Sequence, residues 1–416
     1  MAEPIELTGA VAILEVARRL GATIDLDELL DLIVNETIKV LACDRASIFL
    51  HEADAHEFVT KVAHGLGLVR LSADRGILGA CARQRCLVNV PDAYADDRFN
   101  PDVDRQTGYR TRNILSCPLI GYDGQLVGVV QAVNKHDGAF GAGDERLLEA
   151  LGAQAAVALQ RARLLQEYAK KQRMEQELQL AREIQQGLLP RDNPRIDGYQ
   201  IVGWNRPADE TGGDGYDFIS LSDDRLGVVL ADASGHGIAP ALVVAQLQAM
   251  LRVLLSSMDL GHCRVLQCVN KRLAADLPPD RFVTAFCGVL DTRRHILHYC
   301  SAGQGPILHV RRGGRLARFD ATACPLGILP EMEFHTDAPI HLQVGESVVL
   351  VTDGFYEWSN SREEQFGLER LERLVVDLAE HSAQAILEGI RRDVNRFAEG
   401  TLQRDDLTAI VIKRTA

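Results

Sequence analysis

The sequence predicts an α+β protein built from two mixed domains that a helical segment joins. Three observations carry this prediction. The chain has 416 residues, which is more than one compact domain usually holds. Short apolar runs typical of strands occur in both halves, between amphipathic segments typical of helices. A stretch almost without glycine and proline separates the two halves.

The composition is that of a globular protein and limits the function classes. Apolar residues make up 46% and charged residues 25%, enough for real cores. The net charge of −13 disfavours nucleic-acid binding through a broad basic surface and docking on an anionic membrane. No apolar run approaches the roughly 20 residues of a spanning helix, and the N-terminus lacks the charge layout of a signal peptide. We therefore expect a cytoplasmic protein with neither nucleic acid nor membrane as a partner.

The nine cysteines predict neither a metal site nor a disulfide framework. No two of them form a C-x-x-C pair, and Cys81/Cys86 and Cys263/Cys268 lie five residues apart, a poor spacing for zinc. We expect buried or incidental thiols. A redox sensor at Cys81 or Cys86 stays open, but no residue pattern supports it.

The first predicted domain covers residues 1–160. Asp25 can cap a helix whose apolar residues recur at three- and four-residue spacing. These residues are Leu26, Leu29, Leu30, Ile33 and Ile38. Strand-like runs follow at residues 46–50, 115–120 and 126–134, and the Asp-Gly pair before the last run predicts a hairpin. A helix from Asp144 closes the unit.

The second predicted segment, residues 161–190, is a helical linker. Met174, Leu178, Ala181 and Leu188 follow one helical stripe, although the middle of the segment is strongly polar. Two interpretations are open: a solvated connecting helix, or a short coiled coil that pairs two protomers into a homodimer and transmits a signal.

The third predicted domain, residues 191–416, alternates strand runs with helical segments, and several of its strands begin or end on aspartate. Glycine or a second aspartate accompanies these carboxylates at four places. They are Asp214 and Asp217, Asp232, Asp353, and Asp405 with Asp406. A strand delivers an aspartate rigidly to its tip, and a neighbouring glycine keeps the backbone close.

A lone Asp-Gly pair after a strand is usually only a turn, but four such aspartate sites in one domain predict a metal centre. Converging aspartates repel one another unless a cation lies between them. Carboxylates, carbonyls and water are the ligands of Mg²⁺ and Mn²⁺. Two such ions about 4 Å apart can activate a bridging water for phosphoryl displacement. His236 nearby is either a general acid or a residue that holds its turn.

Five segments occur in order: AREIQQGLLP, RPADETGGDGYDF, LADASGHGIAPAL, LVTDGFYE and RDDLTAIVI. Together they resemble the SpoIIE-like branch of the PPM (type 2C) metal-dependent protein phosphatases, over about residues 180–416. The resemblance implies a PPM-type αββα sandwich with two Mn²⁺ or Mg²⁺ ions at one end. It implies that Asp232 bridges both ions and that the Ala233 carbonyl binds one of them. By the same resemblance, Asp353 and Asp405 complete the ligand set of the second metal ion, and Asp214 contacts the metals directly or through water.

The sequence departs from the family pattern at two positions. Gly215 stands where an aromatic residue is common, and Ala233 stands where the wider superfamily often has glycine. Neither departure removes a ligand side chain. Arg206 is the nearest counterpart of the arginine that holds phosphate in the wider superfamily, although a surface role is open for it.

The family resemblance implies hydrolysis of phosphoserine or phosphothreonine on a partner protein, such as an anti-sigma antagonist, by metal-bound water. An opposing kinase would act in trans. One alternative is an inactive phosphatase-fold scaffold that binds a phosphorylated partner; the retained aspartates argue against it. Another is a metal-dependent phosphodiesterase, but the 12 histidines do not cluster near the aspartates.

Residues 20–165 resemble a GAF domain, which implies a central antiparallel sheet with helices and a small-molecule pocket. The resemblance lies in the segments at residues 26–50 and 92–120 and in the closing helix. A spaced set resembles the signature of GAF domains that bind cyclic nucleotides. It consists of Asn134, Lys135, Phe140, Asp144 and Glu145. These residues either recognise a cyclic nucleotide or lock the last strand to the closing helix.

Overall fold

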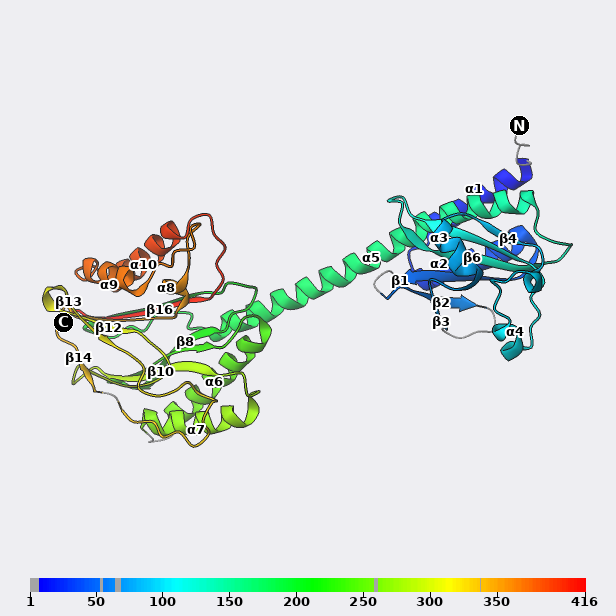
Figure 1. The fold of residues 1–416 in the computed structure, drawn as a ribbon. Helices are drawn as coiled ribbons and strands as arrows, with labels where there is room; N and C mark the ends of the chain where they lie inside the picture. The colour runs from blue at the N-terminus through cyan, green and yellow to red at the C-terminus, as the bar shows by residue number, and fades with distance from the viewer. Residues whose placement is uncertain (1–6, 53–54, 64–68, 258–260, 337) are drawn as a thin grey trace. The chain divides into compact units, whose positions relative to one another are not determined.

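The computed structural model describes residues 7–52, 55–63, 69–257, 261–336 and 338–416. Its contacts divide the chain into two compact units, Met1–Arg173 and Met174–Ala416. Each unit has its own sheets and its own buried core (Figure 1).

A six-stranded antiparallel sheet of order β3-β2-β1-β6-β5-β4 forms the centre of the first unit. Its strands are β1 (Cys43–Glu52), β2 (Glu57–Ala63), β3 (Val69–Ser72), β4 (Val88–Val90), β5 (Ile114–Ile120) and β6 (Leu126–Lys135). Its helices are α1 (Leu7–Ala22), α2 (Leu26–Leu41), α3 (Gly76–Gln84), α4 (Asp102–Thr107) and the first part of α5 (Ala142–Leu188), with a 3₁₀ turn at Ala93–Ala95. This arrangement confirms the GAF-type fold that the sequence predicts.

Local sequence signals set two of these elements. The Asp25 carboxylate accepts hydrogen bonds from the backbone N–H groups of Asp27 and Glu28, both at 3.0 Å, so the predicted cap of α2 is confirmed. The predicted hairpin joins β5 to β6 at residues 121–125, where Gly124 adopts φ = 76°. Glycine takes this left-handed conformation without strain.

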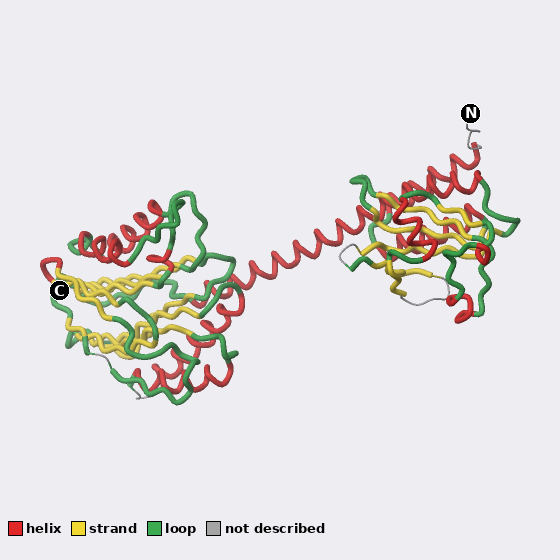
Figure 2. The backbone as a smooth tube through the Cα atoms, viewed as in Figure 1, coloured by secondary structure: helices red, strands yellow, loops and turns green. Residues whose placement is uncertain are grey.

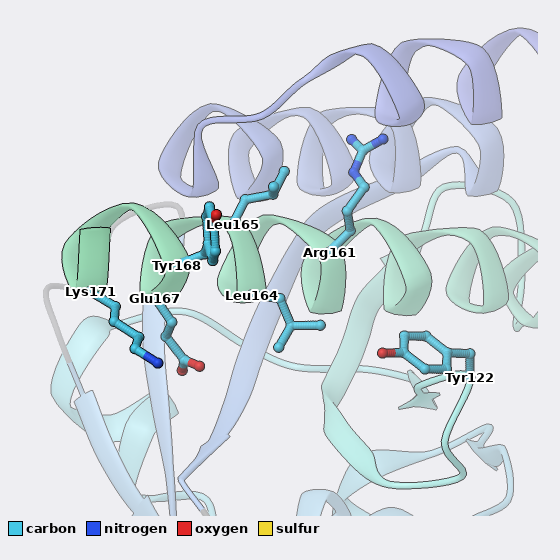
Figure 3. A pocket seen from close by; sticks show the side chains of 7 residues that line it. All are labelled: Tyr122, Arg161, Leu164, Leu165, Glu167, Tyr168 and Lys171. Atoms are coloured by element: carbon cyan, nitrogen blue, oxygen red, sulfur yellow. The ribbon is translucent and has the colours of Figure 1, made fainter. Parts of the chain in front are cut away.

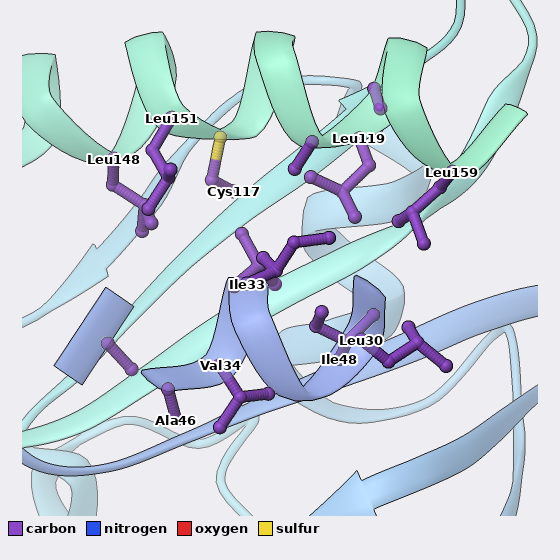
Figure 4. Close-up of a cluster of buried hydrophobic side chains, with 14 of the residues drawn as sticks. Leu30, Ile33, Val34, Ala46, Ile48, Cys117, Leu119, Leu148, Leu151 and Leu159 are labelled. Atoms are coloured by element: carbon purple, nitrogen blue, oxygen red, sulfur yellow. The ribbon is translucent and has the colours of Figure 1, made fainter. Parts of the chain in front are cut away.

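The core of the first unit lies between its sheet and the helices α2 and α5. Leu30 and Ile33 of α2 meet Ile48 of β1, and Leu148 and Leu151 of α5 cover the same sheet (Figure 4). These side chains are almost completely buried. The closing helix is therefore an integral part of this core, because its apolar side chains fill the space over β5 and β6.

The predicted closing helix and the predicted linker form one continuous helix, α5, from Ala142 to Leu188. The buried residues of α5 lie between Leu148 and Ala162, and most residues after Ala162 are exposed. Several large apolar side chains of α5 are exposed: Val157, Leu164, Leu165, Tyr168, Met174, Leu180 and Ile184. The division between the two compact units falls within the predicted linker.

Two five-stranded antiparallel sheets form the second unit, with orders β14-β11-β10-β9-β8 and β13-β12-β15-β16-β7 (Figure 2). The first sheet contains β8 (Asp214–Ser222), β9 (Arg225–Ala233), β10 (Val283–Asp291), β11 (Ile296–Ala302) and β14 (Ile340–His341). The second contains β7 (Tyr199–Arg206), β12 (Ile307–Arg311), β13 (Arg315–Phe319), β15 (Ser347–Val351) and β16 (Leu407–Arg414). The helices are α6 (Ile238–Ser257), α7 (His262–Asp276), α8 (Gly354–Glu357), α9 (Leu368–Asp377) and α10 (Ala383–Phe397), with a 3₁₀ turn at Arg312–Gly314.

Three apolar layers hold this unit together. One fills the space between the two sheets, where Tyr216 and Phe286 of the first sheet meet Ile410 of the second. The helices α6 and α7 cover the outer face of the first sheet. The helices α8, α9 and α10 cover the outer face of the second sheet. The predicted αββα sandwich is confirmed.

Helix α6 corrects one expectation from the sequence. Residues 238–256 are long and apolar enough to cross a membrane, with a mean hydropathy of 1.8, although no run of that kind was expected. The structure places α6 on the sheet, with Val244, Leu247 and Leu251 buried in the core. The helix has this composition because one of its faces fills the layer over β8 and β9.

Candidate functional site

Four strand ends bring the predicted aspartates to one end of the sandwich. Asp214 begins β8 and is the register partner of Asp232 near the end of β9. Asp353 follows β15, and Asp405 and Asp406 precede β16, which pairs with β15. The two sheets therefore present their carboxylates at the same end.

Glycines allow this close approach, as the sequence predicted. Gly354 lies so close to the Asp406 carbonyl that any side chain would collide with it, and Gly212 lies equally close to the Asp406 carboxylate. A Cβ atom on Gly213 would lie 2.7 Å from the Ala233 carbonyl oxygen. Glycine at these positions is thus required by packing of the chain around the carboxylates.

Asp214 is buried and anchored by two threonines. The Thr408 hydroxyl donates to Asp214 Oδ2 at 2.6 Å and the Thr352 hydroxyl donates to the same oxygen at 2.8 Å. Burial, followed by the nearby Asp232 and Asp406 carboxylates, raises the pKa of Asp214 well above its usual range. Its side chain also hydrogen-bonds to Asp232, which partly offsets the rise in the pKa of Asp232.

Asp232 and Asp353 are half-buried, and the folded protein disfavours the negative charge of each carboxylate. Burial, followed by the carboxylates of Asp353, Asp405 and Asp406, raises the pKa of Asp232 to about 8. Burial, followed by Asp405, raises the pKa of Asp353 to about 6. Each carboxylate therefore feels the others, and a cation at this end would relieve the repulsion.

The adjacent residues Asp405 and Asp406 have different surroundings. Asp405 is exposed, and its carboxylate accepts the Asp406 backbone N–H at 2.8 Å. Asp406 is buried, and its carboxylate accepts the backbone N–H groups of Ala208 at 2.7 Å and Asp214 at 3.1 Å. Asp406 therefore holds the segment 208–214 in place, whereas Asp405 faces solvent with a carboxylate able to bind a ligand.

The chemistry of these residues fits divalent metal ions. Oxygen donors of Asp232, Asp353 and Asp405 are hard ligands. The raised pKa values of Asp232 and Asp353 arise from burial and from neighbouring carboxylates, so a cation at this place would favour their charged forms. Among the described residues, no group of three or more histidine, cysteine, aspartate or glutamate side chains is arranged closely enough to hold a metal ion. The carboxylates thus lie at the same end of the sandwich but do not form a compact set of ligands.

The other residues considered from the sequence take different places. His236 is exposed, and its Nδ1 lies 3.0 Å from Asp209 Oδ2. Arg206 donates to Gln403 at 2.6 Å and to Asn395 at 3.1 Å. These two hydrogen bonds hold its guanidinium beside the second sheet. Gly215 lies so close to Val244 of α6 that a side chain would collide, which explains the absence of an aromatic residue there.

Sequence reasoning missed several residues that support the site. Besides Thr352 and Thr408, the amide of buried Gln304 donates to the Val351 carbonyl at 2.9 Å and accepts the Thr284 hydroxyl at 2.9 Å. Arg281 donates to the Ser234 carbonyl at 2.7 Å, beside the segment that follows Asp232. No local motif marks these residues, because their partners are distant in sequence.

The end of α5 also contacts this region. The Gln185 side chain accepts the backbone N–H of Gly212 at 3.0 Å and donates to its carbonyl at 2.5 Å. The Arg252 guanidinium of α6 donates to the Leu188 carbonyl at 2.6 Å and forms an ion pair with buried Asp217. The last turns of α5 are thereby fastened to the strand that begins at Asp214.

In the first unit, the predicted nucleotide signature forms a hydrogen-bonded lock. Lys135 Nζ pairs with Asp144 Oδ1 at 2.7 Å and donates to the Leu41 carbonyl at 3.1 Å. Asn134 is buried; its amide oxygen accepts the Arg112 N–H at 2.6 Å and its amide nitrogen donates to Tyr109 at 2.8 Å. These groups join β6 to the start of α5.

The remaining members of the signature complete the lock. Asn89 of β4 donates to Glu145 at 2.7 Å and to the Phe140 carbonyl at 2.9 Å, and the Phe140 ring is buried in the core. A hollow of about 620 Å³ in this unit lies elsewhere, along α5 (Figure 3). It is lined by Tyr122, Arg161, Leu164, Leu165, Glu167, Tyr168 and Lys171.

Family models match both units. The model described as Stage II sporulation protein E (SpoIIE) matches residues 222–415, which include Asp232, Asp353 and Asp405. The GAF domain model matches residues 25–159.

Two curated relatives and one solved structure are similar to the chain. Protein IcfG of Synechocystis sp. is 29% identical over 266 residues, which is 57% of this chain and 41% of IcfG. The phosphoserine phosphatase RsbU of Bacillus subtilis is 26% identical over 246 residues, 58% of this chain and 71% of RsbU. The chain thus spans less than half the length of IcfG.

The solved structure is the SiaA-PP2C domain of Pseudomonas aeruginosa, with a TM-score of 0.50 and 20% identity over 59% of this chain and 98% of that chain. It supports the fold of the second unit. The chain thus joins a segment that the GAF model matches to a segment that the SpoIIE model matches, and the sandwich of the second unit has the fold of a PP2C-type phosphatase domain.

Proposed function

We propose that the second unit hydrolyses phosphoserine or phosphothreonine on a partner protein, with two Mn²⁺ or Mg²⁺ ions. The observation that carries this proposal is the group of mutually strained carboxylates at one end of the sandwich. A scaffold gains nothing from burying like charges, because their repulsion destabilises the fold. The similarity to a protein named a phosphoserine phosphatase supports the same chemistry.

The residues of this chain would divide the work as follows. Asp232 would bridge the ions, the Ala233 carbonyl would bind one, and Asp353 and Asp405 would hold the other. Asp214 would contact the ions directly or through water, and its two threonine hydrogen bonds fix its carboxylate for this role. When bound, the ions supply an activated water and neutralise charge on the phosphoryl oxygens.

The first test is hydrolysis of p-nitrophenyl phosphate and of a phosphoserine peptide with Mn²⁺ or Mg²⁺. We expect metal-dependent turnover by the wild-type chain, lowered by roughly 100-fold or more in Asp353→Asn, because the substitution removes one charged ligand at a metal that supplies several kcal/mol. Asp223→Asn is the matched control, since Asp223 is exposed at the opposite end of the β8–β9 hairpin.

The main alternative is an inactive phosphatase-fold scaffold that binds a phosphorylated partner. The same assay separates the two. Turnover that is absent with either metal, together with metal-independent binding of a phosphoserine peptide, would support the scaffold. Turnover that is equal in wild type and Asp353→Asn would contradict the assigned site.

We further propose the biological setting that the family resemblance implies. The substrate would be a phosphorylated anti-sigma antagonist-like protein in the cytoplasm, phosphorylated by a kinase acting in trans. The GAF unit would sense a signal; a cyclic nucleotide is one proposed ligand, although the polar atoms of Asn134 and Lys135 are engaged in the lock. The exposed apolar residues of α5 support a homodimer formed along this helix, with a coiled coil in the linker.

The Gln185 contact supports a route by which α5 regulates the metal site. We expect Gln185→Ala to raise the Mn²⁺ concentration for half-maximal activity roughly ten-fold, since each of its two hydrogen bonds to Gly212 is worth about 1 kcal/mol. Gln186→Ala is the control, because Gln186 is the next residue and is exposed. The measurement is a metal titration of p-nitrophenyl phosphate hydrolysis. Equal metal requirements in both variants would rule out this route.

A further inference from the structure

Three cysteines gather where the N-terminal turn of α7 meets the first sheet of the sandwich. Cys263 is the second residue of α7, and Cys287 and Cys300 are register partners on β10 and β11. Cys287 and Cys300 are fully buried in the apolar layer beneath α7, and half-buried Cys263 packs against that layer. None of the three lies among the proposed metal ligands.

Cys263 differs from its neighbours in exposure and in its hydrogen bonds. Its Sγ lies 3.3 Å from Thr336 Oγ1 and also hydrogen-bonds to the Cys300 thiol and the His262 side chain. The hydrogen bond to Cys300 is the main cause that lowers the pKa of Cys263 to about 4; burial opposes it, and His262 and Thr336 add to it. A position in the first turn of a helix favours a thiolate in the same way.

His262 next to Cys263 provides a second, independent observation, because one of its ring nitrogens has no hydrogen-bond partner among the residues that the structure describes. Its ring is 9% exposed, and its Nε2 atom is buried without a hydrogen-bond partner in the described part of the chain. A buried polar atom without a partner destabilises the fold, so such atoms are rare unless they have a chemical role. His262 is in hydrogen-bond contact with Cys263 and can accept its proton.

We propose that Cys263 and Cys300 form a peroxide-reactive thiol pair in which Cys263 attacks the oxidant and Cys300 resolves the product as a disulfide. The partial exposure of Cys263 admits a small oxidant such as hydrogen peroxide, whereas Cys300 is buried and hydrogen-bonds to Cys263. This proposal does not depend on phosphatase activity.

The two steps balance as follows. The Cys263 thiolate sulfur attacks one peroxide oxygen, the O–O bond breaks, and the departing hydroxide takes a proton to become water, leaving a sulfenic acid on Cys263. The Cys300 sulfur then loses its proton and attacks the Cys263 sulfur, and the sulfenic oxygen leaves with that proton as a second water. The two thiols lose two electrons, and one hydrogen peroxide gains them.

The disulfide would tie α7 to β11, which leads towards the carboxylate end of the sandwich. Gln304 lies four residues beyond Cys300 and bridges the Val351 carbonyl and the Thr284 hydroxyl. Thr284 is the register partner of Asp232. Oxidation would therefore place a covalent constraint on the strand that carries this bridge.

The first test measures thiol reactivity in the full, reduced chain with iodoacetamide at about pH 6. We expect Cys263 to be alkylated roughly ten-fold faster or more than Cys268, because thiolates rather than thiols react. Cys268 is a matched control, since it lies on the same helix and is more exposed. Alkylation of Cys263 at or below the rate of Cys268 would overturn the proposal.

The second test identifies the product after peroxide treatment by tryptic digestion without reductant. We expect a cross-link between peptides 253–264 and 295–311, which carry Cys263 and Cys300 and no other cysteine. Reduction should release it, Cys268→Ser should leave it unchanged, and Cys300→Ser should leave a sulfenic acid on Cys263 that dimedone traps. A cross-link to peptide 265–271 or 282–293, or unoxidised Cys263 in the wild-type chain, would contradict the proposal. The wild-type result requires no variant to fold.

Discussion

Asp232→Asn is expected to abolish metal-dependent phosphatase turnover while making the metal-free protein more resistant to heat. Asp232 is the proposed bridge between the two ions, so its loss should lower kcat/KM by roughly 1,000-fold or more. Burial, followed by Asp353 and Asp405, raises the pKa of Asp232 to about 8, which means that its charge is unfavourable in the metal-free fold. Asparagine has nearly the same shape without the charge.

The pH dependence of thermal unfolding checks the second half of this expectation. Because the folded protein binds a proton on Asp232 more tightly than the unfolded chain, this residue lowers stability as the pH rises from about 4 to about 8. Without metal, the melting temperature of the wild type should fall more steeply over this interval than that of Asp232→Asn. Mn²⁺ should then stabilise the wild type and leave the variant unchanged. A variant that still binds Mn²⁺ and turns over would remove Asp232 from the metal site.

Asp405→Ala is expected to lower turnover and Asp406→Ala to lower stability, although the two residues are adjacent. Asp405 is exposed and is a proposed metal ligand, so Asp405→Ala should lose turnover with a stability change within about 0.5 kcal/mol. Asp406→Ala removes the buried acceptor of the Ala208 and Asp214 N–H groups and should cost about 3 kcal/mol. In a domain of this size that corresponds to a loss of roughly 6–12 °C in melting temperature.

Two measurements decide this pair: thermal unfolding of the metal-free variants and metal-dependent hydrolysis of p-nitrophenyl phosphate. Excess Mn²⁺ should not restore the unfolding temperature of Asp406→Ala, because the lost hydrogen bonds lie within the protein. If Asp405→Ala proved to be the destabilised variant and Asp406→Ala the stable, inactive one, the assigned roles would have to be exchanged.

The sequence was most informative where structure depends on residues close in the chain. The Asp25 cap, the Asp123-Gly124 hairpin and the aspartates at strand ends each follow from a few neighbouring residues, and the structure contains all of them. The αββα architecture could be predicted because the strand and helix patterns, together with the family resemblance, indicate the same fold. Local preference and tertiary packing agree in these segments.

The sequence was less informative about groups that act across long separations. Thr352 and Thr408 hold Asp214 from 138 and 194 residues away, and Gln185 contacts Gly212 across the end of a helix. Side-chain hydrogen bonds of this kind leave no periodic signal. Helix periodicity also could not place a boundary inside α5, because the closing helix and the linker share one uninterrupted helical pattern.

The position of β16 in the second sheet has a consequence for how the protein is made. This strand comprises residues 407–414, yet it lies between β15 and β7, and Asp405 and Asp406 directly precede it. During synthesis, β7 has no partner in its sheet until residues about 200 positions later have left the ribosome. The carboxylate end therefore cannot assemble on a nascent chain that lacks β16.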